Sequence, residues 1–430
     1  MTATGDTGSA GISAARRAFL PSPTLPLAYF TGAHLALATA MAALIVRPGL
    51  PGAFHYHPRA IALVHLITLG WISGSILGAL YIVGPLALGA PVRATRLDAL
   101  ACVSYWLGAF GVVAGFWTGR YDVLPPASLL VLVPLAFVGA RMTRALWRSR
   151  TPFGVSLHIV LAFSNIIGAG AAGLALAANR VTGDLPWPPM SLALAHGHLA
   201  VLGWAVMMIF GVAYRLIPMF VPAAMPSGPA LGISAVLLES GTLGLSLALM
   251  TGMPLLPWVS CVAAAFVSFF VQIRRIVRQR RARPAELPAR DWSTWQTHMA
   301  FFYLLLTAGV GIRLSVGETG SALAWVYGVG GLLGFVSQLV VGIQGRLLPL
   351  HAWYRSMDRR HGLPPGVSVH RLIEPRFALV IFVLWLIGVP VLLAGLATGR
   401  HSFVAAGAAA LFGATIVNAA YGARMVRRTG

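Results

Sequence analysis

Apolar residues in this chain fall into twelve long runs that are separated by short polar segments. Each run is close to or above the roughly 20 residues that a helix needs to cross a hydrocarbon core of about 30 Å. The pattern therefore predicts an all-α integral membrane protein with twelve transmembrane helices, at about residues 28–47, 60–88, 99–118, 125–143, 154–178, 190–217, 229–250, 254–273, 296–315, 322–350, 377–397 and 402–423.

A short motif recurs on three of these helices. An aromatic residue, a glycine and a proline follow one another at intervals of seven residues, at Trp71, Gly78 and Pro85, at Trp204, Gly211 and Pro218, and at Phe335, Gly342 and Pro349. The copies lie 133 and 131 residues apart. A period of this length indicates a repeated unit of several membrane helices rather than a solenoid. We expect three pseudo-repeated four-helix groups, at about 28–150, 151–285 and 286–430, with the motif on the second helix of each.

The composition agrees with a membrane protein and changes the interpretation of its charge. Hydrophobic residues make up 58% of the chain and charged residues 10%, with a mean hydropathy of +0.80. The 31 basic residues are all arginine and face only 10 acidic ones, which gives a net charge of +21. A basic protein can bind nucleic acid, but these arginines lie in short loops between apolar runs. We therefore expect the lipid bilayer as partner and no nucleic acid.

The arginine-rich loops alternate along the chain and predict its orientation. Arginines cluster at 16–17, 93–96, 141–150, 274–283, 355–360 and 424–428, whereas the opposite loops carry single ones such as Arg120, Arg180 and Arg400. Positive loops face the cytoplasm, so both termini are expected there, in a bacterial-type inner membrane. Residues 1–27 are predicted as a disordered cytoplasmic segment, and 28–430 as a single membrane domain.

Histidines are the candidate chemistry-bearing residues at the outer end of the bundle. His65 and His198 occupy the same repeated position, six residues before Trp71 and Trp204. Neutral imidazole is a good ligand for haem iron and copper, and ionisable residues within a bilayer are functional candidates. We predict that this pair binds a metal or haem. The alternative is a histidine hydrogen-bonded to a nearby backbone carbonyl.

Three further histidines lie near the predicted pair. In a regular helix two residues span about 200° of rotation, so His196 and His198 point in nearly opposite directions. Equivalence with His65 selects His198 as the inward member, and His196 then addresses another groove or the turn is irregular. His55 and His57, in the loop before the second helix, are candidate copper ligands or ordinary surface histidines.

The sequence leaves more than one role open for two charged residues and for one further set of histidines. Glu239 lies deep in the seventh helix, where it belongs to a proton path or makes a structural hydrogen bond. Arg313, towards the outer end of the ninth helix, is a candidate partner for a haem propionate. The first helices of the three groups carry His34, His158 and His298 near the opposite end, where a capping or interfacial role is expected.

The motif and the helix count together resemble two related families. The run from His196 through His198, Gly203, Trp204 and Gly211 to Pro218 resembles the NnrS family of haem- and copper-associated membrane proteins linked to nitric oxide. The three-group architecture resembles the catalytic subunit of haem-copper oxidases. The resemblance implies bound haem b, copper or both, a redox partner protein, and a role in nitric oxide response, electron transfer or metal handling. If the protein is an enzyme, an oxidoreductase is implied.

The chain departs from the oxidase pattern at the positions that reduce oxygen. That pattern has an adjacent histidine pair on the seventh helix, where this chain has none, and histidines on the tenth, where Val329 occupies the aligned position. We therefore expect no complete oxygen-reducing centre. The alternative function is a membrane transporter or channel on the same scaffold, using Glu239, Arg313 and the histidines for a substrate or protons.

Overall fold

The computed structural model describes residues 20–52, 56–282, 290–317, 320–359 and 368–428. Within these ranges the chain is helical and contains no strand, and twelve helices are long and apolar enough to span a membrane, as the sequence predicts. Nine spans are single helices: α2 (Leu25–Val46), α5 (Arg96–Thr118), α6 (Leu124–Trp147), α7 (Phe153–Thr182), α10 (Ala230–Thr251), α11 (Leu256–Arg278), α12 (Trp292–Ser315), α15 (Pro375–Thr398) and α16 (His401–Arg428).

Three spans are composite helices that carry the repeated motif. Each begins as an α-helix, widens into a π-helical segment of eight residues, and continues as an α-helix. They are α3 (Pro58–His65), η2 (Leu66–Ser73) and α4 (Gly74–Ala87); α8 (Pro189–His198), η4 (Leu199–Val206) and α9 (Met207–Phe220); and α13 (Ser321–Val329), η5 (Gly330–Ser337) and α14 (Gln338–Arg359). Long π-helical stretches are rare and often mark functional sites.

The remaining described elements are short 3-10 turns, η1 (Leu50–Gly52), η3 (Tyr121–Val123) and η6 (Val369–Leu372). The predicted disordered segment 1–27 lies mostly outside the described residues, which begin at residue 20, and α2 begins at Leu25.

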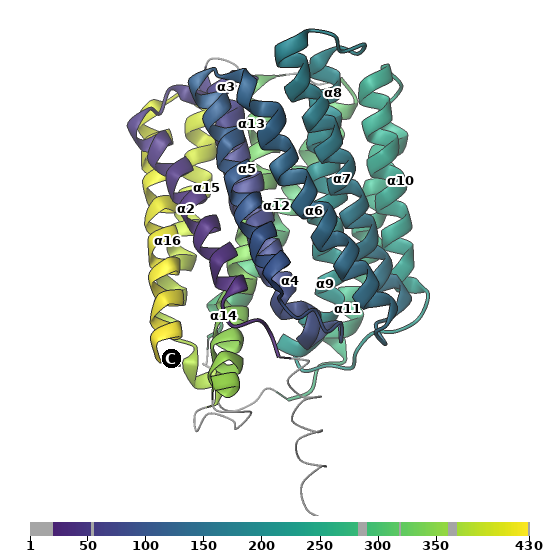
Figure 1. Ribbon diagram of the computed structural model, residues 1–430, viewed down its shortest axis with the longest axis vertical. Helices are drawn as coiled ribbons and strands as arrows, with labels where there is room; N and C mark the ends of the chain where they lie inside the picture. The colour runs from purple at the N-terminus through teal and green to yellow at the C-terminus, as the bar shows by residue number, and fades with distance from the viewer. Residues whose placement is uncertain (1–19, 53–55, 283–289, 318–319, 360–367, 429–430) are drawn as a thin grey trace, which may run out of the picture.

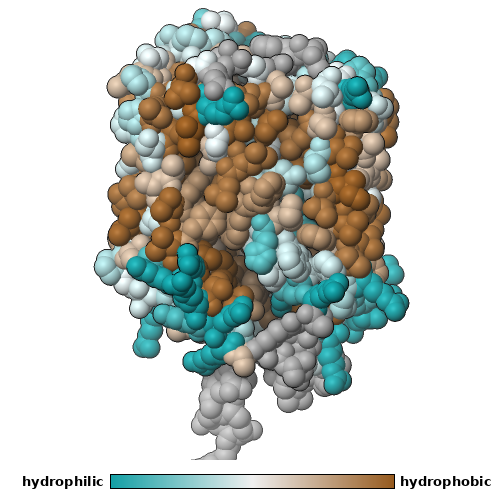
Figure 2. All heavy atoms as spheres, turned by 180° about the vertical axis from the view of Figure 1, so that it is seen from behind, coloured by the Kyte–Doolittle hydropathy of each residue, from teal (hydrophilic) through white to brown (hydrophobic). Residues whose placement is uncertain are grey.

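The helices run up and down along one axis and form a bundle (Figure 1). The C-terminal end of α16 and the ends of α4, α9 and α14 lie at the bottom of this view, and α3, α8 and α13 lie at the top. This alternation puts the described arginine clusters at the bottom, which we name the arginine-rich end, and His57, His65, His196 and His198 at the other, which we name the histidine end. Figure 2 shows a brown apolar band between teal polar ends, as a bilayer requires.

The three composite helices form the centre of the bundle. In their most apolar windows 72, 67 and 61% of the residues are buried, against 22–50% in the other nine spans. η5 contacts both η2 and η4, and α4 contacts both α9 and α14. The aromatic residues of the motif, Trp71, Trp204 and Phe335, are buried there. The motif helices are therefore inner helices, and their neighbours face lipid.

Glycines let the composite helices approach the helix that precedes them. A Cβ on Gly70 would overlap that of Ala36 on α2, one on Gly203 would lie 2.6 Å from Cγ of Asn165 on α7, and one on Gly334 would lie 2.5 Å from Cγ of Tyr303 on α12. Gly78 approaches Tyr29 on α2 in the same way, and Gly74 makes room for Trp106 on α5, the helix that follows. The glycine stripe of the first motif thus serves close helix packing, as such stripes do in membranes.

Candidate functional site

A large cavity lies among the inner helices in the half of the bundle near the histidine end. Its volume is about 860 Å³, and most of its lining is aliphatic or aromatic, with residues from η2, η4 and η5 among them. Its polar lining includes His65, His196, His198, Tyr327 and Arg180. Ligand pockets typically enclose about 300–1,000 Å³ with few polar groups on apolar walls, and this cavity has that character.

His65 closes α3 immediately before the π-helical segment η2. Its Nδ1 lies 2.8 Å from the carbonyl oxygen of Ile61, one turn back on the same helix. A carbonyl only accepts, so Nδ1 carries the proton and Nε2 keeps its lone pair. The ring lies between Phe116 and His196, with ring centroids 5.8 and 6.2 Å away. Among the described residues, Nε2 has no hydrogen-bond partner.

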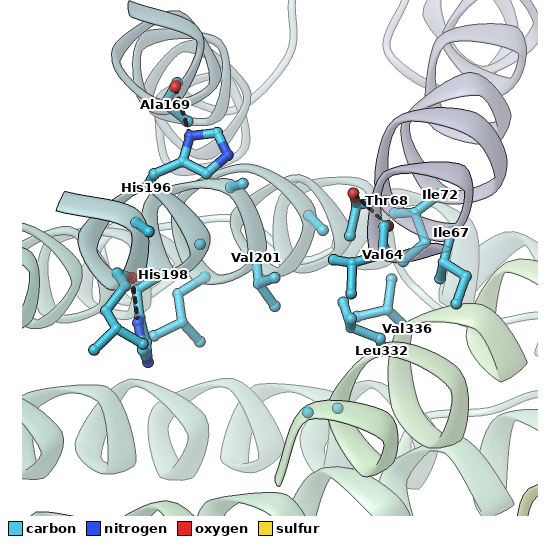
Figure 3. A pocket seen from close by; sticks show the side chains of 18 of the residues that line it. Val64, Ile67, Thr68, Ile72, Ala169, His196, His198, Val201, Leu332 and Val336 are labelled. Atoms are coloured by element: carbon cyan, nitrogen blue, oxygen red, sulfur yellow. Dashed lines mark hydrogen bonds between the residues drawn. The ribbon is translucent and has the colours of Figure 1, made fainter. Parts of the chain in front are cut away.

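His196 on α8 has the same arrangement of its two nitrogens. Its Nδ1 donates to the carbonyl oxygen of Ala169 on α7 at 2.8 Å, as Figure 3 shows. The ring planes of His196 and His65 are inclined by only 23°. Gly173 leaves room for the imidazole, because a Cβ there would lie 3.1 Å from Cε1 of His196. Two imidazoles thus face one cavity with their Nδ1 atoms fixed and, in the described part of the chain, with Nε2 unbonded.

His198 lines the same cavity but has another partner. Its Nδ1 donates to the carbonyl oxygen of Leu194 at 2.8 Å, and its Nε2 lies 3.1 Å from the hydroxyl of Tyr327 on α13. The two rings are 6.0 Å apart and inclined by 31°. The structure therefore brings His65 together with His196, whereas the sequence repeat had favoured His198. His196 and His198 bond to different neighbours, Ala169 and Tyr327, although both line this one cavity rather than separate grooves.

The two ring pairs follow one rule in terms of the repeat. The offsets of 133 and 131 residues define one position occupied by His65, His198 and Val329, and another, two residues earlier, occupied by Leu63, His196 and Tyr327. His65 of the first copy contacts His196 of the second, and His198 of the second contacts Tyr327 of the third. In both pairs the partner stands two residues before the equivalent position in its own copy. Tyr327, which the sequence analysis missed, could have been found as the equivalent of His196.

Two arginines differ in their relation to the cavity. Arg313 is exposed on α12 and does not line it. Arg180 on α7 does, and its guanidinium lies 5.3 and 5.5 Å from the ring centroids of Tyr56 and Tyr121. Cation–π contacts of this kind hold a guanidinium in place without neutralising it. Arg180 is therefore the cation that lines the cavity within the described ranges. The sequence pattern placed this single arginine in a loop, whereas it lies in the last turn of α7.

The remaining candidates lie away from this centre. His55 is outside the described residues. His57 caps α3, and its Nδ1 accepts a hydrogen bond from the amide of Arg59 at 3.2 Å. Glu239 on α10 accepts a hydrogen bond of 2.6 Å from Nδ2 of Asn165 on α7 and does not line the cavity. Glu239 therefore makes a structural hydrogen bond, which is one of the two roles that its sequence position suggests.

No group of three or more His, Cys, Asp or Glu side chains that could hold a metal ion occurs within the described ranges. The site thus offers two imidazoles rather than a complete protein cage. No protein-family model matches the chain, and no curated protein is detectably similar to it.

Proposed function

We propose that this protein is a haem- and/or copper-binding membrane protein of the haem-copper oxidase superfamily, close to the NnrS family. One observation carries the proposal: His65 and His196 line a large, mostly apolar cavity, backbone carbonyls fix their Nδ1 protons, and neither Nε2 has a hydrogen-bond partner within the described ranges. Metal-ligating histidines are oriented in this way by a partner on the other ring nitrogen.

The donor set consists of one imidazole nitrogen from each ring, the kind of ligand that binds a metal ion at about 2.0 Å. The two ring centroids lie 6.2 Å apart, so both rings belong to one site. The cavity favours haem b over an isolated copper ion, because a mostly apolar space of about 860 Å³ suits a large flat group. Arg180 at this cavity would pair with an acidic substituent of that group. Haem would supply redox chemistry and bind small gases such as nitric oxide.

We propose a role in nitric oxide response, electron transfer or metal handling, with a redox partner protein. α10 carries no histidine, and α14 has only His351, which is buried near the arginine-rich end. The chain therefore lacks the ligands of a complete oxygen-reducing centre.

Detergent-purified protein tests the proposal through its visible spectrum and metal content. We expect a Soret band or bound copper, lost in His65→Ala and in His196→Ala with folding intact. His198→Ala, which removes the partner of Tyr327, is the matched control and should keep the cofactor. Loss in His198→Ala but not in His196→Ala would restore the pairing that the repeat alone favours. A protein without absorbance or metal would support the transporter or channel alternative.

We also infer that the twelve helices form three groups of four, about 28–150, 151–285 and 286–430. Three π-helical segments of eight residues begin at Leu66, Leu199 and Gly330, with the same offsets as the motif. Gly173 and Gly311 support the same division: a Cβ on either would lie 3.1 Å from a ring atom, of His196 and of Tyr327 respectively.

The arginine-rich end is proposed to face the cytoplasm of a bacterial-type cell, with both termini inside. Reporter fusions after residues near 120 and 180 should be active outside, and fusions near 145 and 280 inside. The reverse pattern would move the histidine end to the cytoplasmic side and contradict this orientation.

A further inference from the structure

The third copy of the motif lacks a side chain that the other two have. Tyr81 on α4 donates to Oδ1 of Asp98 at 2.8 Å, and the hydroxyl of Tyr214 on α9 lies 2.9 Å from that of Ser234. The repeat offset of 131 places Gly345 at this position on α14. The first two copies therefore fill a space near the arginine-rich end with a tyrosine, and the third leaves it open.

A small cavity occupies the open space. Its volume is about 20 Å³, and its lining includes Gly345, Ser293, Gln296, Asn418 and Tyr421. Roughly 10–15 Å³ suffices for one water molecule, provided that about two to four polar groups can bind it. Hydroxyl and amide side chains supply those groups here. We name this space the Gly345 cavity.

The Gly345 cavity lies close to the surface of the arginine-rich end. Trp292, the first residue of α12, is part of its lining. The preceding residue, Asp291, forms an ion pair with Arg346, and their side chains are 17 and 12% exposed. The two members of this partly exposed ion pair are thus the chain neighbours of two residues that line the cavity, Trp292 and Gly345.

From the cavity a chain of hydrogen bonds leads to a buried histidine. Nδ2 of Asn418 on α16 lies 2.8 Å from Oε1 of Gln344 and 3.0 Å from Nε2 of His34 on α2. Nδ1 of His34 donates to the carbonyl oxygen of Phe30 at 2.7 Å, so Nε2 is the acceptor. His34 is only 8% exposed, and its ring meets Trp71 edge-on.

No described ion pair includes His34. Around α2, Asp98 of α5 pairs with Arg141, and Arg424 and Arg428 of α16 pair with Glu374, while Arg346 of α14 pairs with Asp291. Arg96 of α5 and Arg427 of α16 are exposed. The tyrosines there, Tyr29, Tyr81 and Tyr105, contact one another. His34 is therefore the titratable group at the end of the polar chain.

We propose that the Gly345 cavity holds a water molecule that, through Asn418, gives His34 proton exchange with the arginine-rich side of the membrane. When the Asn418 side chain turns aside, the water takes its place beside Nε2 of His34 and gives it a proton; Asn418 then returns with Oδ1 towards the ring and accepts from the new N–H. The proton on Nδ1 stays with Phe30, and solvent restores the proton that the water gave up. His34 becomes an imidazolium and releases its proton by the reverse route.

His158 is a matched internal control for this proposal. It lies on the first helix of the second group, is 0% exposed, and also donates from Nδ1 to a carbonyl, that of Gly154. Its Nε2 bonds to Ser234, which Tyr214 covers with its hydroxyl. The bond partner of His158 is thus covered by a tyrosine, whereas Asn418, the bond partner of His34, lines the Gly345 cavity.

Deuterium exchange at the C2 position of each imidazole, followed by mass spectrometry, tests the proposal on the full-length purified protein. C2 exchange needs water to reach a ring that can be protonated. We expect His34 to exchange about tenfold or more faster than His158, because a sealed site exchanges only when helices separate. Exposed His401 reports the upper limit. Equal, slow exchange of His34 and His158 would overturn the proposal, and this comparison needs no variant.

Two variants then separate water access from packing. Gly345→Ala places a Cβ against Oγ of Ser293 and should slow His34 to the rate of His158. Gly413→Ala, on the same helix as Asn418, meets only Leu384 at 3.7 Å and should change nothing. If His34 still exchanges rapidly in a folded Gly345→Ala protein, water reaches it by another route and the cavity assignment is wrong.

Discussion

At the scale of single residues, the decisive feature is the division of labour between the two nitrogens of an imidazole. The sequence offered two interpretations of His65, as a metal ligand or as a histidine bonded to a carbonyl. The structure shows the carbonyl bond through Nδ1, and that bond is also what orients Nε2 for a metal. The two interpretations are therefore compatible, and neither could be chosen from residue type and spacing alone.

Asp98 is a buried charged residue whose loss should clearly lower stability. Its carboxylate is fully buried and accepts from Tyr81, from Thr95 and from Arg141. Asp98→Ala leaves the Arg141 charge and the Tyr81 hydroxyl without their partner, which should cost about 3 kcal/mol. The expected result is a clearly lower thermal unfolding midpoint of the purified protein.

Asp122→Ala is the control for this prediction. Asp122 also pairs with an arginine, Arg120, at 2.9 Å, but both side chains are mostly exposed at 62 and 70%. Exposed pairs contribute little to stability, so the midpoint should not change. Equal effects of the two substitutions would mean that burial of the Asp98 network is not what stabilises it.

At the scale of helices, the hydrophobic pattern predicted existence and length well and internal geometry poorly. Observed spans begin and end within a few residues of the predicted ones, except where arginine-rich turns extend them, as in α14, which reaches Arg359. Arginine favours helix and its stem covers apolar surface, so a hydropathy boundary ends such a helix too early. The π-helical segments could not be recognised in the sequence, because they are as apolar as the helical segments before and after them.

The close approach at Gly70 gives the prediction that belongs to this scale. A Cβ at Gly70 would overlap Cβ of Ala36, and neither helix can yield by rotating a side chain. Gly70→Ala should therefore cost about 1–3 kcal/mol by overpacking, seen as a lower unfolding midpoint and a reduced yield of folded protein.

Gly168→Ala on α7 is the matched substitution, because no atom lies within 4 Å of the added methyl group. Alanine favours a helix over glycine by up to about 1 kcal/mol, so this variant should be as stable as the parent or slightly more so. A Gly70→Ala protein that unfolds at the same temperature as Gly168→Ala would show that η2 and α2 are not packed this closely.

At the scale of the whole molecule, the ring pairs explain why the repeat alone grouped His65 with His198, although the ring beside His65 is that of His196. Subunits related by rotation meet head to tail, so equivalent residues do not contact each other. The proposed groups behave in this way: His65 meets His196, and His198 meets Tyr327. The repeat identifies which residues are equivalent in the three copies. The contacts between groups, however, join a residue to the one that lies two positions before its equivalent in the next copy.

This arrangement predicts that a second metal site can be made by one substitution, if the proposed function holds. Tyr327 stands where His196 stands in the preceding copy, and its distance to His198, 6.0 Å, is close to the 6.2 Å between His65 and His196. Tyr327→His would free Nε2 of His198 from the tyrosine hydroxyl. Nδ1 of His198 is already held by Leu194, as that of His65 is by Ile61. Metal analysis should therefore find more copper or haem per chain than in the parent. Tyr327→Phe also frees His198 but adds no nitrogen, and should bind no more than the parent. A folded Tyr327→His protein with parental metal content would show that the two contacts are alike in spacing only, and that the cavity has one site that can bind a metal.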